Sequence, residues 1–411
     1  MRKIYFELID YALITLFFLF PFLNLFRTLD KLHVDFSYLS ILSSSVLVYL
    51  LFTKRFESLL LQVKKKEIIA FLIFLTLGLI SIFYAFNLVE AIIDFSRFFI
   101  FLLVLLELYV LSKDKKIDFF IFFLVSFLSV ESIKIFFVFV ENFTFEKGLQ
   151  RIRDLQGFSF NQNIGAFSLV IKTPILFYSL YNTRNKIFKT LQYLLILITF
   201  FDVIIIGSRG AILALILIIL FLSGVSFYKK DYKLLKYQSI LILCFLATSL
   251  IQSNLYKVSE NLQLQNRITN FIDASTKGRL IYYKACIDKI FENPIIGVGV
   301  GNWKILSLKY GSEDIESYEV PYHAHNDFLH LASEIGVLGS VSYLLIFIFP
   351  IYYLILINRD YSYFAFIIIA SIIVFLIDSN LNFPRARPYS FINIISILVV
   401  FNLYREKLKI S

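Results

Sequence analysis

The chain has 411 residues, of which 59% are hydrophobic and only 17% are charged, and its mean hydropathy is +0.77. A soluble domain needs more polar surface than this, so the sequence predicts an integral membrane protein. We interpret the net charge of +10 first as a signal of membrane orientation, and a nucleic-acid partner is not needed to explain it. Two cysteines, Cys244 in an apolar run and Cys286 in a polar one, are too few for a disulfide framework.

About twelve apolar runs are long enough to cross roughly 30 Å of hydrocarbon. The first follows Met-Arg-Lys without a small-residue cleavage site, which favours an uncleaved membrane helix over a signal peptide. Backbone groups in lipid must be hydrogen-bonded internally, and no alternating barrel pattern occurs. We therefore predict an all-α polytopic membrane protein. The runs lie near 8–28, 33–53, 67–86, 91–112, 118–140, 163–181, 187–206, 209–227, 236–252, 338–357, 362–379 and 389–404.

Lys and Arg are concentrated in alternate connections, such as 54–66, 112–116 and 228–236, which places these connections and both termini in the cytoplasm. The connection at 253–324 then lies outside and is far longer than the others, as functional loops often are. This predicts three parts of the chain. They are residues 1–252 with transmembrane helices 1–9, residues 253–337 with a large outer loop and amphipathic helices, and residues 338–411 with transmembrane helices 10–12.

The segment GSRGAIL at 207–213 places a Gly-Ser hinge before Arg209, which opens the eighth helix. Free backbone N–H groups and the positive end of the helix dipole attract anions there, and an Arg side chain adds its own donors. Because positive residues are disfavoured outside and a helix N-terminus repels Arg, we favour a bound anion. The alternative is that Arg209 only extends to the membrane interface.

The outer loop contains a helical pattern between residues 275 and 292, and Asn293-Pro294 ends it. We expect an amphipathic helix lying at the membrane interface, with Arg279 at its start. Arg279 is then either a second anion contact or a solvated loop arginine. The following GVGVG at 297–301 lacks the glycine spacing of a dinucleotide site, and we interpret it as a flexible turn. The apolar positions of the pattern are Leu280, Tyr283, Ile287, Ile290 and Phe291.

Three of the four histidines lie in HAHNDFLH at 323–330. His323 and His325 form an H-x-H pair, which is compatible with a metal site, a structural histidine at a helix start, or a general base. Metal is the least favoured, because no cysteine accompanies the pair and two such imidazoles share a face only in extended backbone. Imidazole titrates near neutral pH, which favours a general base or a histidine that positions substrate, with Asn326 and Asp327 to orient it. His330 lies among leucines and is expected to be structural.

Charged side chains also lie within the predicted spans, where they are costly. Asp94 and Arg97, near the outer end of the fourth helix, are expected to pair with each other. Glu131, Lys134 and Lys172 lie nearer the midplane and are expected to form a buried structural cluster.

In this order and spacing, the motifs resemble the O-antigen ligase/O-antigen polymerase superfamily. Each motif is loose by itself, whereas the whole series, with one long outer loop before the last three helices, is fairly specific. The residues that carry the resemblance are GSRG at 207–210, Gly278-Arg279, NPIIGVGVGNW at 293–303 and HAHNDFLHLASEIGVLG at 323–339, with FPRARP at 383–388 and GFSFNQNIGA at 157–166 as supporting features.

The resemblance implies a glycosyltransferase type C-like fold in the bacterial inner membrane, with a large periplasmic loop and the active site on the periplasmic side. It implies transfer of O-antigen polysaccharide from undecaprenyl pyrophosphate to lipid A–core oligosaccharide, without a cofactor. The catalytic residues of the family correspond to Arg209, Arg279 and His325. The two arginines then bind the donor pyrophosphate and stabilise the leaving group. His325 accepts a proton from the acceptor hydroxyl or orients it.

Further substrate contacts are expected from His323, Asn326, Arg385 and Arg387. The transfer is expected to be inverting and independent of metal, and membrane lipids are expected to surround the spans. Two alternatives remain open. A polysaccharide polymerase takes the same donor but a second lipid-linked glycan as acceptor. A lipid-linked glycan flippase lines its midplane with charges on several helices, whereas the polar motifs here gather at one outer rim.

Overall fold

The computed structural model is almost entirely helical, which confirms the predicted all-α class. A pair of two-residue strands, β1 (Phe143–Thr144) and β2 (Gly148–Leu149), runs antiparallel with Phe143 opposite Leu149. The structure describes residues 2–19, 31–144, 148–149, 155–159, 161–258, 274–305, 307, 322–357 and 362–410.

The chain divides into two compact units that interleave along the sequence. Unit 1 comprises Met1–Lys115, Ala274–Tyr352 and Ser379–Ser411, and unit 2 comprises Lys116–Asp273 and Tyr353–Asp378. The expected three-part division at residues 253 and 338 stays a prediction about membrane placement. The contacts group the loop helix with the first five helices.

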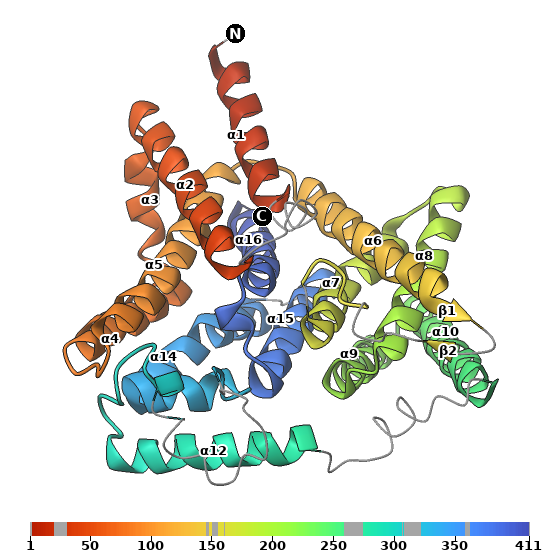
Figure 1. Cartoon of the computed structure of the whole chain (residues 1–411). Helices are drawn as coiled ribbons and strands as arrows, with labels where there is room; N and C mark the ends of the chain where they lie inside the picture. The colour runs from red at the N-terminus through yellow and green to blue at the C-terminus, as the bar shows by residue number, and fades with distance from the viewer. Residues whose placement is uncertain are drawn as a thin grey trace. The chain divides into compact units, whose positions relative to one another are not determined.

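Unit 1 is built around α5, which packs against α1, α2, α3, α4 and α16 (Figure 1). The Asn87 side chain caps α5 by accepting from the backbone N–H groups of Val89 and Glu90. Nearly all residues in the second half of α5 are buried, and the rings of Phe101 and Phe391 stack with centroids 4.0 Å apart. The helices of this unit are α1 (Arg2–Leu19), α2 (Lys31–Phe52), α3 (Phe56–Gln62), α4 (Lys66–Ile82), α5 (Leu88–Leu111), α12 (Ala274–Glu292), most of α14 (Asp327–Ile357), η3 (Pro384–Ala386) and α16 (Pro388–Ile410).

Unit 2 is a bundle in which α7 and α8 pack against each other and against α6, and α10 packs on α8 and α9. Asn161 and Asn185 cap α7 and α8, because their side-chain oxygens accept from free N–H groups of the first turn. The helices are α6 (Ile117–Asn142), α7 (Gln162–Asn182), α8 (Lys186–Ile206), α9 (Arg209–Tyr228), α10 (Tyr232–Val258) and most of α15 (Tyr363–Leu381).

Each of the predicted apolar runs overlaps a helix, but the count of twelve membrane spans is not confirmed. Among the described residues, 7 helices are long and apolar enough to cross a membrane, or 8 if the pair α2 and α3, bent by 114°, forms one span. The helix α4 has only 17 residues. The helix α5 carries Glu90, Asp94, Arg97 and Glu107. The helix α4 is therefore set apart from the seven candidate spans by its length, and α5 by its charged side chains.

The expected span at 338–357 is the second part of a longer helix, α14, which already begins at Asp327 and is kinked at Gly336. Gly336 has φ 82° and ψ 169°, and a Cβ atom there would lie 2.0 Å from the carbonyl oxygen of Ile295. Only glycine fits this conformation and this contact. The kink therefore separates a short first part, which begins at the histidine segment, from the apolar second part.

The glycine-rich turn at 297–301 is not the flexible turn that the sequence suggested. The backbone N–H groups of Val298 and Gly299 donate to the carbonyls of Ser333 and Glu334, each at 2.9 Å. A Cβ atom at Gly297 would lie 2.4 Å from the Glu334 carbonyl carbon. The turn thus packs directly on the backbone just before the α14 kink and provides hydrogen bonds for carbonyls that the kink leaves without helical partners.

The charged side chains within the helices pair largely as expected. Arg97 donates to Asp94 at 2.7 Å, and Lys172 Nζ lies 2.8 Å from Glu131 Oε2 with both side chains buried. Lys134 differs from the prediction, because it donates to the Gly157 carbonyl at 2.8 Å and lies 4.0 Å from the centroid of the Phe158 ring. Gly157 lies against Glu131, a member of the buried pair, and Phe158 lies under Lys134.

Candidate active site

The histidine segment forms the start of α14. Asn326 precedes the first helical residue, and its side-chain oxygen accepts from the Leu329 N–H at 3.0 Å, as an N-cap does. The sequence suggested Asn326 as a substrate contact, but this capping bond already uses its side-chain oxygen. His325 has φ 57°, a left-handed conformation that is unfavourable for a non-glycine residue. Such strain is common at functional sites.

His323 and His325 meet on one aromatic ring, that of Phe383. The His323 ring stacks on it with centroids 4.2 Å apart, and the His325 ring meets it edge-on at 4.9 Å. The Nδ1 atoms of both histidines are buried, and neither has a hydrogen-bond partner among the described residues. Among all the residues that the structure describes, no group of three or more His, Cys, Asp and Glu side chains is arranged to hold a metal ion.

Positive charge surrounds His325. Burial, together with the charges of Arg279 and Arg387, lowers the pKa of His325 to about 4. Burial also lowers the pKa of His323 well below its ordinary value. Both imidazoles are therefore neutral at neutral pH, and His325 has a free ring nitrogen that can accept a proton. An anion bound between the two arginines would offset their charge and make His325 a stronger base.

Arg279 lies on the loop helix α12 (Figure 1) and is near enough to His325 for its charge to lower the pKa of the imidazole. The Tyr283 hydroxyl donates to the His325 carbonyl at 3.1 Å, and Arg279 lies one helical turn before Tyr283. Cys286, on the next turn, packs with Trp303 and Ala324 in a small buried cluster. The helix itself and its end before Asn293-Pro294 are as predicted. Tyr283 and Cys286 are the residues through which α12 contacts the histidine segment and Trp303.

The expected amphipathic face of α12 is only partly right. Leu280, Ile287 and Phe291 are exposed, whereas Ala285 and Cys286 are buried. Cys286 contacts Ser333 of α14 at 3.9 Å, whereas the larger apolar side chains of the pattern are exposed. The prediction missed this because apolar residues of a membrane protein also face outward, so an apolar stripe does not identify the packed face.

Arg385 is held inside unit 1 by buried carboxylates. Its Nε lies 3.2 Å from Asp327 Oδ1, and its backbone N–H donates to Asp327 Oδ2 at 3.1 Å. A guanidinium nitrogen also lies 3.8 Å from Glu334 Oε2. The other oxygen of Glu334 lies 3.2 Å from His330 Nε2 and accepts the Trp303 N–H at 3.0 Å. This network ties the FPRARP segment to the first part of α14.

Arg387 differs from Arg385 in having no carboxylate partner. In the described part of the chain no ion pair reaches it, its Nε is buried without a hydrogen bond, and burial lowers its pKa. Its guanidinium lies 5.1 Å from the centroid of Phe383, the ring that both histidines contact. Because its half-buried guanidinium meets no carboxylate among the described residues, Arg387 is well placed to bind an anion.

Arg209 begins α9 as the sequence predicted. The helix α8 ends at Ile206, Gly207 has a left-handed φ of 70°, and Ser208 stands at the N-cap without making a side-chain capping bond. The half-buried Arg209 is thus near backbone N–H groups that helix geometry leaves free. Arg209 belongs to unit 2, and its convergence with Arg279 and His325 stays a prediction.

Sequence reasoning missed the residues that hold the site together. Glu334 follows His330 by four residues in HLASE, a spacing that places both on one helix face, so this pair had a signal. Phe383 belongs to the FPRARP segment and Tyr283 to the helical pattern, but nothing in the sequence indicated their contacts with the histidines. Those contacts join segments far apart in the chain. Arg385 and Arg387 looked equivalent, and only the fold distinguishes them.

Residues 194–344 match the family model for O-antigen ligase. The matched region includes the GSRG hinge, α12, the glycine-rich turn and the histidine segment. It supports the O-antigen ligase superfamily and, with it, a membrane enzyme of the glycosyltransferase kind that acts on lipid-linked glycans. FPRARP and GFSFNQN lie outside the match. No curated protein sequence matches the chain.

Proposed function

We propose that this chain is an O-antigen ligase, which transfers O-antigen polysaccharide from undecaprenyl pyrophosphate to lipid A–core oligosaccharide on the periplasmic face of the inner membrane. The observation that carries the proposal is the neutral, strained His325 between the positive charges of Arg279 and Arg387. A base beside an anion site is the combination that glycosyl transfer from a pyrophosphate requires.

In the proposed reaction, the acceptor hydroxyl oxygen attacks the anomeric carbon of the donor sugar from the face opposite the pyrophosphate. The bond between the anomeric carbon and the phosphate oxygen breaks, and its electron pair stays on the pyrophosphate. Arg279, Arg387 and Arg209 stabilise that charge, and His325 takes the hydroxyl proton. The configuration at the anomeric carbon is inverted. The arginines supply the positive charge that the leaving group needs, which is why we propose a metal-independent reaction.

The low pKa of His325 also implies that the donor binds before the proton is transferred. Without donor, the arginine charges weaken the imidazole as a base. A pyrophosphate bound to the arginines cancels part of this effect and raises the pKa of His325 towards neutrality. The base is therefore strongest when the donor is in place. Arg385 and Asn326 act in this scheme as positioning residues, because a buried ion pair and a helix cap already occupy them.

The acceptor distinguishes the ligase from a polysaccharide polymerase, which would share the donor residues. Basic side chains in the outer loops would suit an anionic lipid A–core acceptor. One of them, Lys304, instead forms an ion pair with Glu90. Arg151, Arg153, Arg267 and Lys309, and the side chains of Lys257 and Lys277, lie outside the described residues. We keep the ligase as the proposal because the single long loop precedes the last three helices.

Reconstitution of the full chain in vesicles tests the proposal. The donor is a polymer linked to undecaprenyl pyrophosphate, and the acceptor is either lipid A–core or a single lipid-linked repeat unit. The ligase reading requires product with lipid A–core, unchanged by EDTA. Elongation with the second acceptor alone would identify a polymerase. Donor movement across the bilayer without any new glycosidic bond would identify a flippase.

A further inference from the structure

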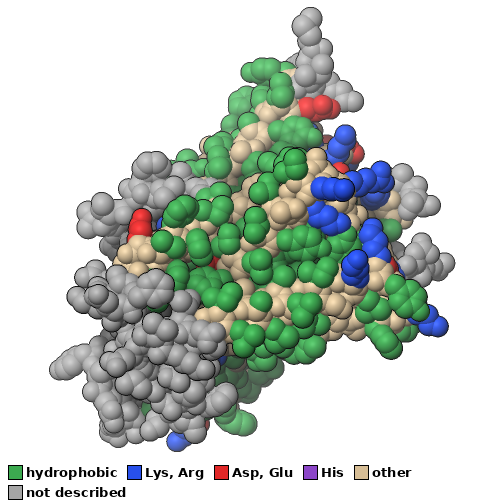
Figure 2. All heavy atoms as spheres, turned by 90° about the vertical axis from the view of Figure 1, so that its right-hand side faces the viewer, with side chains coloured by type: hydrophobic (Ala, Val, Ile, Leu, Met, Phe, Trp, Pro, Cys, Tyr) green, Lys and Arg blue, Asp and Glu red, His purple; other side chains and the backbone are tan. Residues whose placement is uncertain are grey.

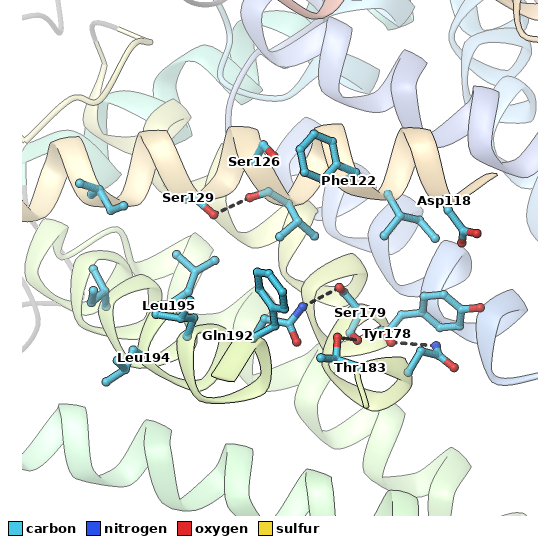
Figure 3. Close-up of a pocket in the computed structure, with 17 residues that line it drawn as sticks. Asp118, Phe122, Ser126, Ser129, Tyr178, Ser179, Thr183, Gln192, Leu194 and Leu195 are labelled. Atoms are coloured by element: carbon cyan, nitrogen blue, oxygen red, sulfur yellow. Dashed lines mark hydrogen bonds between the residues drawn. The ribbon is translucent and has the colours of Figure 1, made fainter. Parts of the chain in front are cut away.

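Unit 2 contains a large apolar groove that the proposed transfer does not use. It lies between α6, α7 and α8, has a volume of about 790 Å³, and is lined mainly by apolar side chains (Figure 3). Several of these are strongly exposed, including Phe122 at 67%, Phe188 at 62% and Leu191 at 53%. All three helices are long and apolar enough to cross a membrane, so the groove is open to lipid along its length.

One end of this groove continues into a second, polar cavity of about 370 Å³. Asn182 and Thr183, at the end of α7, line both cavities. The polar cavity presents three cations from three segments, Arg184, Lys189 and Lys233. Figure 2 shows basic side chains gathered at one edge of a broad apolar surface. The apolar groove thus adjoins, at one end, a cavity with three cations, which we call its mouth.

The lysines at this mouth are held in place by aromatic rings. Lys233 Nζ lies 4.4 Å from the centroid of Tyr181, and Lys189 Nζ lies 4.7 Å from that of Tyr237, whose hydroxyl it also contacts. Two carboxylates lie at this end of the groove. Asp231 accepts from the Tyr181 hydroxyl at 3.3 Å and from the Leu234 N–H at 2.9 Å, and Asp118 belongs to the groove lining. The three cations outnumber these two carboxylates, so the mouth keeps a net positive charge.

We propose that this groove is a binding site for an anionic phospholipid, with an acyl chain between α6 and α8 and the phosphate at Arg184, Lys189 and Lys233. The site lies in unit 2, and its residues differ from those of the proposed reaction centre. By the distribution of Lys and Arg, its mouth lies at the cytoplasmic ends of the helices, where anionic lipids attract basic side chains.

The length of the groove fits one lipid molecule in one leaflet. Its lining on α6 runs from Asp118 to Ile133, which corresponds to about 22 Å along a helix. Half of a bilayer measures about 20–22 Å when the headgroup region is included. Asp118 stands at the end where the phosphate would lie, and Ile133 at the end of the acyl chain. A free phosphate ion would fill only the mouth and leave the apolar part unexplained.

Lipid binding to the purified full chain, measured by native mass spectrometry in detergent, tests the proposal. Phosphatidylglycerol is compared with phosphatidylcholine of the same acyl chains, and we expect tighter binding of the anionic lipid. The double variant Arg184→Gln/Lys233→Gln is expected to weaken phosphatidylglycerol binding by about tenfold or more. The matched control, Lys186→Gln/Lys236→Gln, removes two exposed cations from α8 and α10 outside the cavity and should change binding by less than about twofold.

A second pair of variants tests the apolar part. Ser129 lines the groove and donates only to the Val125 carbonyl of its own helix, so Ser129→Phe narrows the groove without removing a tertiary bond. It should weaken both lipids. Ser239 is an exposed residue of α10 whose hydroxyl likewise donates to a carbonyl of its own helix, so Ser239→Phe should leave the binding of both lipids unchanged. Equal binding of both lipids, no effect of Ser129→Phe, or displacement of the lipid by inorganic phosphate alone would each overturn the proposal.

Discussion

The two arginines of FPRARP show how the fold assigns different roles to residues that look alike. Arg385 is enclosed by Asp327 and Glu334, and Arg387 has no carboxylate partner in the described part of the chain. From the sequence both were expected to contact substrate. Nothing in a two-residue spacing tells which side chain meets a carboxylate from another helix, because that depends on how η3 lies against α14.

The difference between these arginines predicts opposite effects of mutation. Arg385→Ala leaves two buried carboxylates without a cation, so we expect it to lower the free energy of unfolding by about 3–5 kcal/mol. Arg387→Ala removes a half-buried cation that has no carboxylate partner among the described residues, and it should change stability by less than about 1 kcal/mol, while it weakens glycan transfer. Denaturant unfolding and transfer assays on both variants measure this. A larger loss of stability in the Arg387 variant would contradict the assignment.

The environment of His325 predicts its titration. With a pKa of about 4, its imidazole is unprotonated in the free protein over the whole range above pH 5. The unfolded chain binds a proton below about pH 6.5, so His325 lowers stability as pH falls from 6.5 towards 4. Arg387→Gln removes one of the charges and should raise the pKa, which NMR of the labelled imidazole measures. Lys304→Gln serves as the control, since Lys304 is paired with Glu90. A pKa near 6.5 in the unmutated protein would disprove the proposed arginine environment.

At the scale of elements, hydropathy predicted where helices lie but not how they pack. The apolar runs from 67–86 to 389–404 all overlap helices, because burial in lipid leaves the backbone no other hydrogen-bonded choice. The start of α14 and the packed face of α12 were not predictable in this way. The start of α14 is set by the Asn326 cap, and the packed face of α12 by contacts of Tyr283 with His325 and of Cys286 with Ser333. No hydrophobic period records such contacts.

The kink of α14 predicts a strong position-specific effect of a single methyl group. Gly336→Ala would place a Cβ atom 2.0 Å from the Ile295 carbonyl oxygen in a backbone region open almost only to glycine. We expect a loss of at least about 3 kcal/mol in stability. Gly224→Ala in α9 is the matched control, because nothing lies within 4 Å of its Cβ position. Helix propensity should make that variant more stable by about 0.5–1 kcal/mol. Similar unfolding curves for both variants would contradict the packing of the turn on α14.

At the scale of the whole molecule, the proposed reaction needs residues from both units. Arg279, His325 and Arg387 belong to unit 1, and Arg209 belongs to unit 2. The sequence motifs named Arg209, Arg279 and His325 without indicating this division, because the units interleave along the chain. The convergence of Arg209 with Arg279 and His325 therefore stays a prediction.

The orientation of the whole molecule predicts which segments are open to each side of the membrane. By the distribution of Lys and Arg, Asp114 between α5 and α6 faces the cytoplasm, and Tyr322 before the histidine segment faces outward. Both side chains are exposed. Single Cys substitutions at these positions can be labelled in intact cells with a membrane-impermeant maleimide, in a Cys244→Ser background. Cys286 can stay, because burial raises its pKa to about 12 and only the thiolate reacts. We expect labelling of Tyr322→Cys in intact cells and of Asp114→Cys only after the membrane is opened. The reverse pattern would place His325 in the cytoplasm, away from a donor displayed on the outer face, and would remove the basis of the proposed reaction.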